Sequence, residues 1–356
     1  MKKKAELKNS FVKKLFSASG VVITPHVGPD GDAVASTVSL SFMLKDKNIP
    51  SIVLVEKKED FYKEYNKLKV CINITEPPFT LTEELDKNLI ISLGSSPIHI
   101  YVDCSQKNRI GKTFDIITSS KIIKDSFNDT IAIDHHENPD KFIESFIDKD
   151  APSTGNLMFD IMTTLYQNKK DININLATSI YYAIASDTDN FRHLNTEDAN
   201  TFENAKVLVE LGANPSIIFN AMHGGRPLES VEYMAKVLGS LKTLKNNSVL
   251  IATDDKNMFK LFGREKRPSN SIYDTLLGIQ GAELVGFLKY KEEDNLIEGS
   301  LRVSPNSTYQ AHIISRLIAN GGGHEKAAGF TFSGTMDETF KALKDIINTK
   351  TKEIKK

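Results

Sequence analysis

Four short segments of the sequence gather histidine and aspartate side chains of the kind that bind divalent metal ions. The first segment, HVGPDGDA, contains His26, Asp30 and Asp32, and its glycines and proline predict a tight turn. One imidazole with two carboxylates is a ligand set suited to manganese, iron, cobalt or zinc. Taken alone, the segment is equally compatible with an ordinary Asp–Gly turn and one structural histidine.

Two further segments end apolar runs typical of buried strands. Asp134, His135 and His136 are consecutive in AIDHHENP, and Asp103 ends the run PIHIYVD. Three adjacent metal-capable residues at a strand end are difficult to explain as packing, although a polar surface loop is an alternative. Asp103 alone is better explained as the cap of a following helix than as a functional group at the carboxyl end of a strand.

Asp187 and Asp189 form the fourth segment, where ASDTDNFRH closes a helical pattern. Acidic groups at a helix C-terminus oppose the helix dipole, so either a nearby cation or exposure to solvent is expected. Together the four segments hold enough imidazole and carboxylate groups for two cations. Two cations about 3.5–4 Å apart generate hydroxide near neutral pH and stabilise the attacking and leaving oxygens at phosphorus. The sequence therefore predicts metal-dependent hydrolysis of a phosphate ester.

Near the C-terminus, the segment GGGHEKAAGF (321–330) follows SLRVS (300–304). Consecutive glycines let a ligand approach the backbone closely, and their amides can form an anion-binding concavity. Arg302 and His324 can add charge-assisted hydrogen bonds to a phosphate. A glycine-rich turn before the next element is the alternative. The sequence contains no GxxxxGK[ST] motif, so an ATP-binding phosphate loop is not expected.

The elements that must position these residues follow an α/β pattern. Strand-like apolar runs alternate with helical patterns, which predicts a parallel sheet with helices on both faces. The carboxyl ends of parallel strands lie at one edge, so the first three segments would meet there. Strands are predicted at 20–27, 51–56, 97–103 and 129–136, and helices at 32–48, 153–167, 175–188 and 196–212.

A glycine- and proline-rich segment at 223–230 marks a domain boundary, after which a β-rich pattern restarts. A chain of 356 residues also exceeds what one hydrophobic core usually supports. We expect a smaller α/β domain after the boundary, with the active site in the cleft between the two domains. The expected parts are a catalytic metal-binding domain at 1–224, a linker helix at 225–243 and a substrate-binding domain at 244–356. Strands of the second domain are predicted at 248–255, 282–290 and 298–304.

Composition limits the possible partners and location. The formal net charge is −1, so a long basic track for duplex DNA is not expected. The two cysteines, Cys71 and Cys104, are too few for a disulfide framework and fit a reducing compartment. No apolar run approaches the length of a membrane span. We therefore expect a cytoplasmic protein that does not contact a membrane.

The order of these segments resembles the DHH phosphoesterase superfamily: HxxxDxD, a strand-end Asp, DHH, a later Asp and a distal GGGH. The resemblance extends from about residue 10 to about residue 335. The two-domain length is similar to that of the nanoRNase and pAp-phosphatase group. Members of that group degrade very short oligoribonucleotides and dephosphorylate 3′-phosphoadenosine 5′-phosphate (pAp). The resemblance implies two divalent metal ions, manganese by preference, a short RNA or small nucleotide as substrate, and is compatible with a homodimer.

The resemblance also implies a role for each matching residue. Asp103 would bridge both metal ions, with His26 and Asp30 on one of them and Asp32, His135 and Asp187 on the other. His136 would contact the substrate phosphate, and Asp134 would orient its neighbours. In the second domain, the implied substrate-binding residues are Arg302, Gly322, Gly323 and His324.

The sequence departs from the family pattern at three places. Asp189 stands where the family commonly has the glycine of a DTG motif, so extra negative charge is expected near the metal ions. The segment SLRVS replaces an SLRS-like motif but keeps Arg302. Three glycines occupy 321–323, where four are frequent. None of these departures removes an implied metal ligand.

Several other activities fit parts of the same pattern. A standalone cyclic or linear dinucleotide phosphodiesterase has this same compact layout. A RecJ-like exonuclease would need further domains and a longer basic groove. A family II inorganic pyrophosphatase would carry an SRKKQ-type clamp, which is absent from the sequence. A non-catalytic nucleotide sensor is an alternative of another class, but it would have lost metal ligands that this sequence keeps.

Overall fold

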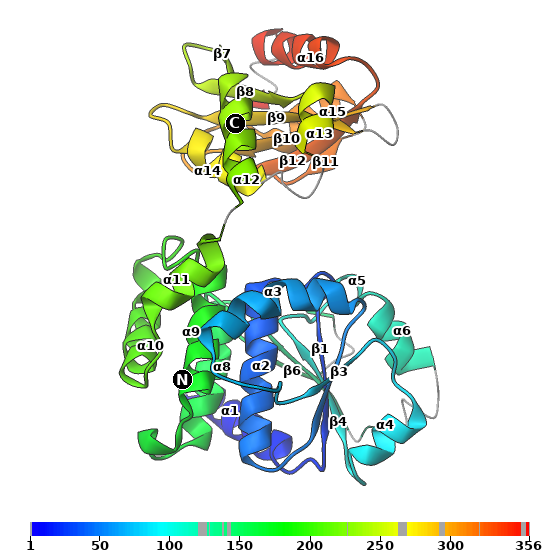
Figure 1. Ribbon diagram of the computed structural model, residues 1–356, viewed down its shortest axis with the longest axis vertical. Coiled ribbons are helices and arrows are strands. Elements are labelled where there is room, and N and C mark those ends of the chain that lie inside the picture. Colours follow the sequence, from blue (N-terminus) through cyan, green and yellow to red (C-terminus); the bar gives the residue numbers. More distant parts are fainter. Residues whose placement is uncertain are drawn as a thin grey trace. The chain divides into compact units, whose positions relative to one another are not determined.

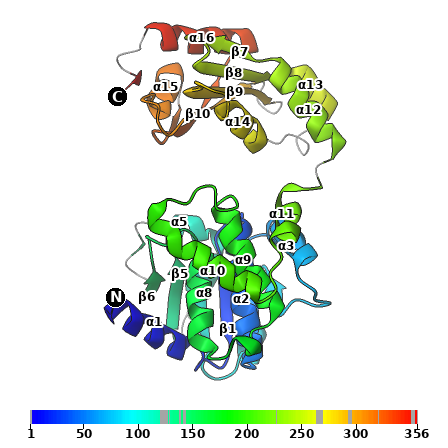
Figure 2. The same ribbon diagram turned by 90° about the vertical axis from the view of Figure 1, so that its left-hand side faces the viewer.

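The chain folds into two compact units, Met1–Gly225 and Arg226–Lys356, each with its own sheet and core. Figures 1 and 2 show the computed structural model in two views. The structure describes residues 2–119, 127, 129–136, 139–140, 144–225, 227–262, 269–291, 296–319, 321–349 and 354–355.

The first unit contains a six-stranded sheet in the order β3-β2-β1-β4-β5-β6, in which every pair is parallel. Its strands are β1 (Val21–Pro25), β2 (Ser51–Leu54), β3 (Thr80–Thr82), β4 (Ile98–Val102), β5 (Asp129–Asp134) and β6 (Glu144–Ile147). The four strands predicted from apolar runs are observed as β1, β2, β4 and β5. The edge strands β3 and β6 have no matching prediction because three or four residues carry too little pattern.

Helices surround this sheet, and the predicted ones appear as α2, α8, α9 and α10. The described helices of the unit are α1 (Lys2–Leu15), α2 (Gly31–Asp46), α3 (Lys58–Cys71), α4 (Lys87–Ser92), α5 (Lys107–Ile110), α6 (Lys112–Ser119), α8 (Thr154–Leu165), α9 (Ile174–Asp187), α10 (Ala199–Glu210) and α11 (Pro215–His223). Two short 3-10 turns, Lys169–Asp171 and Thr196–Asp198, precede α9 and α10.

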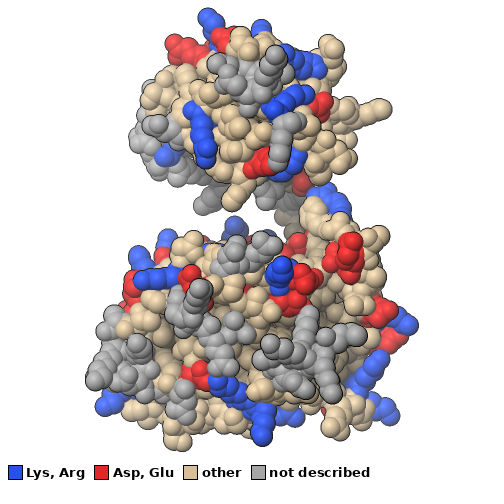
Figure 3. All heavy atoms as spheres, turned by 180° about the vertical axis from the view of Figure 1, so that it is seen from behind, with Lys and Arg blue, Asp and Glu red and all other residues tan. Residues whose placement is uncertain are grey.

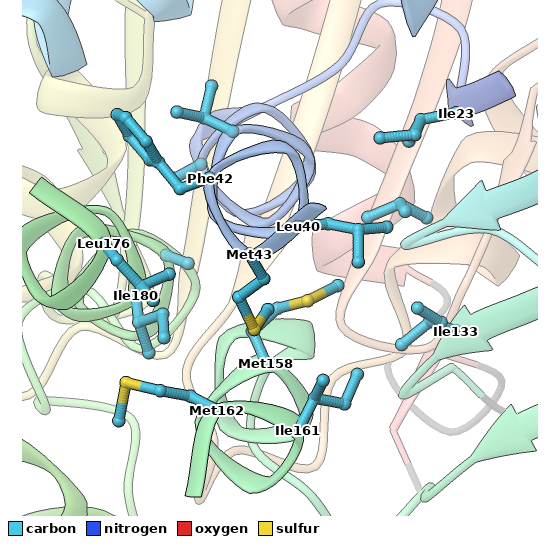
Figure 4. Close-up of a cluster of buried hydrophobic side chains, with 14 of the residues drawn as sticks. Ile23, Leu40, Phe42, Met43, Ile133, Met158, Ile161, Met162, Leu176 and Ile180 are labelled. Carbon is cyan, nitrogen blue, oxygen red and sulfur yellow. The ribbon is translucent and has the colours of Figure 1, made fainter. Parts of the chain in front are cut away.

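Helices cover both faces of the sheet, as the sequence predicts. Strand side chains alternate between faces, so Val21 and Ile23 of β1 join a core with α2, α8 and α9, whereas Val22 packs with Ile90 of α4 and Ile117 of α6. The larger core is shown in Figure 4, where Met43 of α2 and Met158 of α8 point toward one another. This packing fixes the helices whose ends carry the candidate ligands.

Two glycines allow α2, α8 and α9 to approach closely where the candidate ligands lie. A Cβ atom on Gly31, at the start of α2, would overlap the hydroxyl oxygen of Ser186 in α9. A Cβ atom on Gly155, at the start of α8, would lie 2.8 Å from the Cβ of Ala183. The N-terminal ends of α2 and α8 therefore lie directly against the C-terminal half of α9.

The second unit contains a mixed sheet in the order β11-β12-β10-β9-β8-β7. Only β8 and β9 are parallel among the described pairs. Its strands are β7 (Lys242–Leu244), β8 (Val249–Asp254), β9 (Leu284–Lys291), β10 (Leu296–Val303), β11 (Gly322–Gly323) and β12 (Ala327–Phe332), and its helices are α12 (Leu228–Gly239), α13 (Lys256–Phe262), α14 (Ser269–Leu277), α15 (Ala311–Ile318) and α16 (Met336–Thr349).

The predicted strands at 248–255, 282–290 and 298–304 are observed as β8, β9 and β10. Helix α12, within the range where a linker helix is expected, belongs to the second unit, because Tyr233 and Val237 pack against Leu250 and Ala252 of β8. The glycine-rich segment forms a β-hairpin, β11–β12, against β10. None of the helices within the described ranges combines the length and apolar character that a membrane span requires.

Candidate metal centre

Seven histidine and aspartate side chains converge at the carboxyl end of the first sheet. They form three overlapping groups, and within each group one possible ligand atom per residue lies within 4.8 Å of the others. The groups are His26–Asp30–Asp103, Asp32–His135–Asp187 and Asp103–His135–His136. The structure thus brings together all six residues predicted as ligands, and His136 with them.

Asp103 lies between the imidazoles of two different segments. It follows β4 directly and takes a left-handed backbone conformation, with φ of 58°. Its Oδ2 atom lies 3.4 Å from Nε2 of His26, and its Oδ1 atom lies 3.5 Å from Nε2 of His135. Nε2 of His135 is also 3.5 Å from a carboxylate oxygen of Asp187. A carboxylate with one oxygen toward each imidazole has the geometry that bridging two cations requires.

The orientations of His26 and His135 match those of metal-binding imidazoles. Nδ1 of His26 lies 2.9 Å from the carbonyl of Val27, and Nδ1 of His135 lies 3.2 Å from that of Ala151. A carbonyl only accepts, so each Nδ1 carries a proton, and Nε2 is the ring nitrogen left to bind a cation. Both Nε2 atoms are buried and have no hydrogen-bond partner among the described residues. Buried polar atoms rarely lack a partner, and a cation would satisfy both nitrogens.

Asp32 is buried and held by the first turn of α8. The backbone N–H groups of Thr154 and Gly155 donate to its carboxylate at 2.7 and 3.0 Å, and the Ser36 hydroxyl donates at 2.9 Å. The positive end of the helix dipole favours a carboxylate there. Burial nevertheless raises the pKa of Asp32 well above its usual value, and the charges of Asp103 and other nearby carboxylates raise it further.

The neighbouring groups show the same excess of negative charge. Burial opposes protonation of His26, but the carboxylates of Asp103 and Asp30 outweigh burial and raise its pKa to about 10. Burial raises the pKa of Asp187, in spite of the opposing charge of His135. The described residues therefore supply less positive charge than these carboxylates require. Divalent cations would supply it, so the donor set fits them.

Asp30 has two tasks at the start of α2. One carboxylate oxygen caps the helix by accepting from the N–H of Ala33 at 3.1 Å. The other oxygen lies 3.7 Å from Nε2 of His26. The same carboxylate can therefore end the turn predicted from HVGPDGDA and still bind a cation.

Asp134 fixes His136 beside the candidate ligands. Its Oδ1 accepts from Nδ1 of His136 at 2.7 Å and from the backbone N–H of His136 at 3.1 Å, and its Oδ2 accepts from Ser105 at 2.5 Å. Burial would raise the pKa of Asp134, but these hydrogen bonds hold it below the usual value. Because Nδ1 of His136 is engaged, its Nε2 is the ring nitrogen left to contact a ligand.

Three hydroxyl residues in this site, Ser36, Ser105 and Thr154, have no counterpart in the sequence analysis. Ser36 lies one helical turn after Asp32, a spacing that could have indicated it. Thr154 also donates its hydroxyl to Asp103 at 2.7 Å. The contacts of Ser105 and Thr154 join segments distant in sequence, so no local pattern indicates them.

Asp189 is not a member of the three groups. Its carboxylate lies 2.6 Å from the guanidinium of Arg192 in an ion pair on the surface. Asp189, Asn190 and Phe191 are consecutive residues in left-handed backbone conformations, with φ of 47°, 54° and 69°. The side chain of Asn190 contacts Nε2 of His223 at 2.8 Å. The left-handed backbone gives a physical reason why glycine suits position 189.

In the second unit, the predicted substrate residues lie on neighbouring strands. Arg302 of β10 pairs with Ala327 of β12, whose other neighbour β11 contains Gly322 and Gly323. The guanidinium of Arg302 lies 4.9 Å from the centre of the Tyr273 ring. His324 is exposed, and its backbone N–H donates to Ala327 in the hairpin at 2.7 Å. Since that amide is engaged, a phosphate here would rely on the His324 side chain and the neighbouring glycines.

Only glycine fits at position 323. Its φ is 133°, and a Cβ atom would lie 2.6 Å from the carbonyl oxygen of Ala327.

On the face shown in Figure 3, described Lys and Arg residues are interspersed with Asp and Glu on both units. This distribution differs from the basic stripe typical of proteins that bind long duplexes.

Comparison with known proteins gives consistent results. Residues 20–184 match the DHH family, N-terminal domain. The chain is 22% identical over 343 residues to the bifunctional oligoribonuclease and PAP phosphatase NrnA of Bacillus subtilis, covering 96% of this chain and 97% of that protein. An exopolyphosphatase-related protein from Bacteroides fragilis has a similar structure, with a TM-score of 0.71, 23% identity and 96% of both chains covered. RecJ from Thermus thermophilus in complex with Mn²⁺ matches with a TM-score of 0.52 and 12% identity, over 99% of this chain and 55% of RecJ.

Proposed function

Because this chain belongs to the DHH family of phosphoesterases, we propose that it hydrolyses very short oligoribonucleotides to mononucleotides and pAp to AMP, with two divalent cations, Mn²⁺ by preference. The observation that carries this proposal is the pair of buried Nε2 atoms of His26 and His135, which face opposite oxygens of Asp103. The similarity to NrnA over nearly the full length of both proteins supports the choice of substrates.

Each predicted ligand has a place in this proposal. One cation would be held by His26 and Asp30 and the other by Asp32, His135 and Asp187, with Asp103 shared by both. When bound, the cations would supply Lewis-acid activation of water and of the phosphate oxygens.

The remaining residues of the site would position the substrate. His136, fixed through Nδ1 by Asp134, would donate from Nε2 to an oxygen of the phosphate being cleaved. Ser105 holds Asp134, so the hydrogen-bond chain Ser105–Asp134–His136 keeps the imidazole in one orientation. In the second unit, Arg302 and His324 would bind the far phosphate of the substrate, which would limit its length.

A cytoplasmic location and a homodimer belong to the same proposal. Cys71 and Cys104 are free thiols, which fits a reducing compartment.

A long single-stranded RNA would be a poor substrate because the second unit would bind a terminal phosphate. Long duplex DNA is not expected as a substrate, since the formal net charge is −1.

The test is hydrolysis by the full-length protein with Mn²⁺ of pAp, a dinucleotide, a pentanucleotide, a long single-stranded RNA and cyclic di-AMP. We expect fast turnover of pAp and the dinucleotide and slow turnover of the long RNA. Preference for cyclic di-AMP would replace the proposal with a signalling phosphodiesterase. Turnover of none of them would replace it with a nucleotide sensor. Asp103→Asn, which keeps the size of the side chain and one acceptor oxygen, should abolish turnover of every substrate.

A further inference from the structure

The chain from the end of β4 through α5 contacts the candidate metal centre at Arg109, besides Asp103 and Ser105. The backbone carbonyl of Arg109, in α5, accepts from the N–H of Val27 at 2.8 Å. Val27 follows His26, and its own carbonyl accepts from Nδ1 of His26. The backbone of Arg109 is therefore tied directly to the residue that orients one of the imidazoles.

The position of Arg109 is fixed on its other side as well. Ile110 is fully buried, in a small core with Tyr101. A Cβ atom on Gly111, which has a φ of 67°, would overlap the side chains of Val27 and Glu56. The backbone of Arg109 therefore cannot shift without moving the turn that contains His26.

The charge of the Arg109 guanidinium reaches residues on both sides of the centre. The hydrogen bond with Asp134 raises the pKa of His136, and the charge of Arg109 works against that rise. Burial would raise the pKa of Asp30, but its hydrogen bonds with His26 and Ala33, together with the charges of His26 and Arg109, lower it below the usual value. Arg109 is half-buried, so its charge is only partly screened by solvent.

Arg109 has no anionic partner in the described part of the chain, and in this it differs from Arg192. Arg192 is paired with Asp189, and the guanidinium of Arg302 lies over Tyr273. No ion pair or side-chain hydrogen bond joins Arg109 to any described residue, although carboxylates surround the centre. A guanidinium presents a planar fork of donors that matches phosphate oxygens, so its free donors suit an anion from outside the chain.

We propose that the guanidinium of Arg109 binds a non-bridging oxygen of the phosphate group that is cleaved, beside His136. This inference rests on the proposed function, because it assigns a further substrate contact to the same site. Arg109 would neutralise phosphate charge that the metal ligands themselves cannot neutralise, since those ligands are carboxylates and imidazoles that are neutral when they bind a cation.

The test compares Arg109→Gln and Arg109→Lys with a matched control, Lys107→Gln, an exposed residue of the same short helix. Calorimetry on the full-length, Mn²⁺-saturated protein measures binding of inorganic phosphate and of AMP, and a separate titration measures binding of Mn²⁺. We expect Arg109→Gln to weaken binding of both anions about tenfold or more, and Arg109→Lys to weaken it less. Lys107→Gln should leave it unchanged.

The binding of Mn²⁺ separates a substrate contact from a structural role. Removal of a positive charge near the cations should leave Mn²⁺ affinity unchanged or raise it slightly. Anion affinity unchanged in Arg109→Gln, or Mn²⁺ affinity lowered as much as anion affinity, would overturn the inference.

The same data distinguish this inference from the proposed function. If the wild-type protein hydrolyses neither oligonucleotides nor pAp, the proposed function fails, but selective loss of phosphate binding in Arg109→Gln still supports the anion contact. If hydrolysis is observed and Arg109→Gln binds phosphate as tightly as wild type, only the assignment of Arg109 fails.

Discussion

Thr154 positions Asp103 through its side chain: its hydroxyl donates a 2.7 Å hydrogen bond to Oδ1, the same oxygen that lies 3.5 Å from Nε2 of His135. The backbone N–H of Thr154 donates at 2.7 Å to a second carboxylate, that of Asp32. One residue in the first turn of α8 therefore orients two of the predicted ligands, from two different segments of the chain.

Thr154→Val should weaken metal binding without removing a ligand. Valine keeps the shape of the side chain and the backbone bond to Asp32, but it loses the hydroxyl that orients Asp103. Loss of such an orienting partner typically lowers metal affinity about 10–100-fold, and calorimetric titration with Mn²⁺ measures it. Thr163→Val, an exposed change in the same helix, is the control. Equal Mn²⁺ affinity in both variants would show that the hydrogen bond from Thr154 to Asp103 does not contribute to metal binding.

The buried His99 should make the protein less stable in acid. Its ring is fully buried on β4, its Nε2 lies 3.0 Å from the hydroxyl of Thr24, and burial lowers its pKa to about 3. In the unfolded chain its pKa is about 6.5. The unfolded state therefore binds one more proton between these values, and stability is lost as pH falls through this window, by about 1.4 kcal/mol per pH unit.

Urea unfolding of His99→Gln and of wild type at pH 7 and pH 5 measures this effect. The loss of stability on acidification should be about 2 kcal/mol smaller in His99→Gln than in wild type. His193→Gln, which changes an exposed histidine, should lose as much as wild type. An equal loss in all three proteins would mean that His99 titrates in the folded state.

Gly31→Ala should separate α2 from α9 and disturb the ligands at their ends. The added Cβ would overlap the hydroxyl of Ser186, in a crowded position that also contains Tyr182. Overpacking of this kind costs about 1–3 kcal/mol, and the free energy of unfolding in urea measures it. The double variant Gly31→Ala, Ser186→Gly should recover most of the loss. If the single variant is as stable as wild type, the two helices have more room than the structure indicates.

Asp189→Gly should be tolerated. Glycine adopts the left-handed conformation at this position without the steric cost that aspartate bears, but it loses the partly exposed ion pair with Arg192. These effects oppose each other, so the free energy of unfolding should change by less than about 1 kcal/mol. Asp187→Gly, two residues earlier, should abolish metal-dependent stabilisation in a thermal melt. Similar melting behaviour of the two variants would contradict their different roles.

The sequence predicted the parts of the fold that long patterns encode. His26 and Asp103 directly follow β1 and β4, and Asp134 ends β5; these strand ends meet because the sheet is parallel. The edge strand β3 has only three residues, and β11 consists of Gly322 and Gly323, so neither carries a strand pattern.

Contacts between distant segments could not be predicted in the same way. The bond from Thr154 to Asp103 joins residues 51 positions apart. The contact between Val27 and Arg109 uses backbone atoms, which leave no trace in residue type. The left-handed conformations at 189–191 depend on how α9 ends against its surroundings, and none of these residues is a glycine.

The candidate ligands come from four segments of the first unit, the earliest at His26 and the last at Asp187, at the C-terminal end of α9. A chain synthesised from its N-terminus therefore lacks a complete set of ligands until α9 has left the ribosome, when about half of the protein exists. Until then the core also lacks α9, which packs against α2 and α8, so the first unit cannot complete its fold. The arrival of α9 would let folding and metal uptake be completed together, before the second unit has been made.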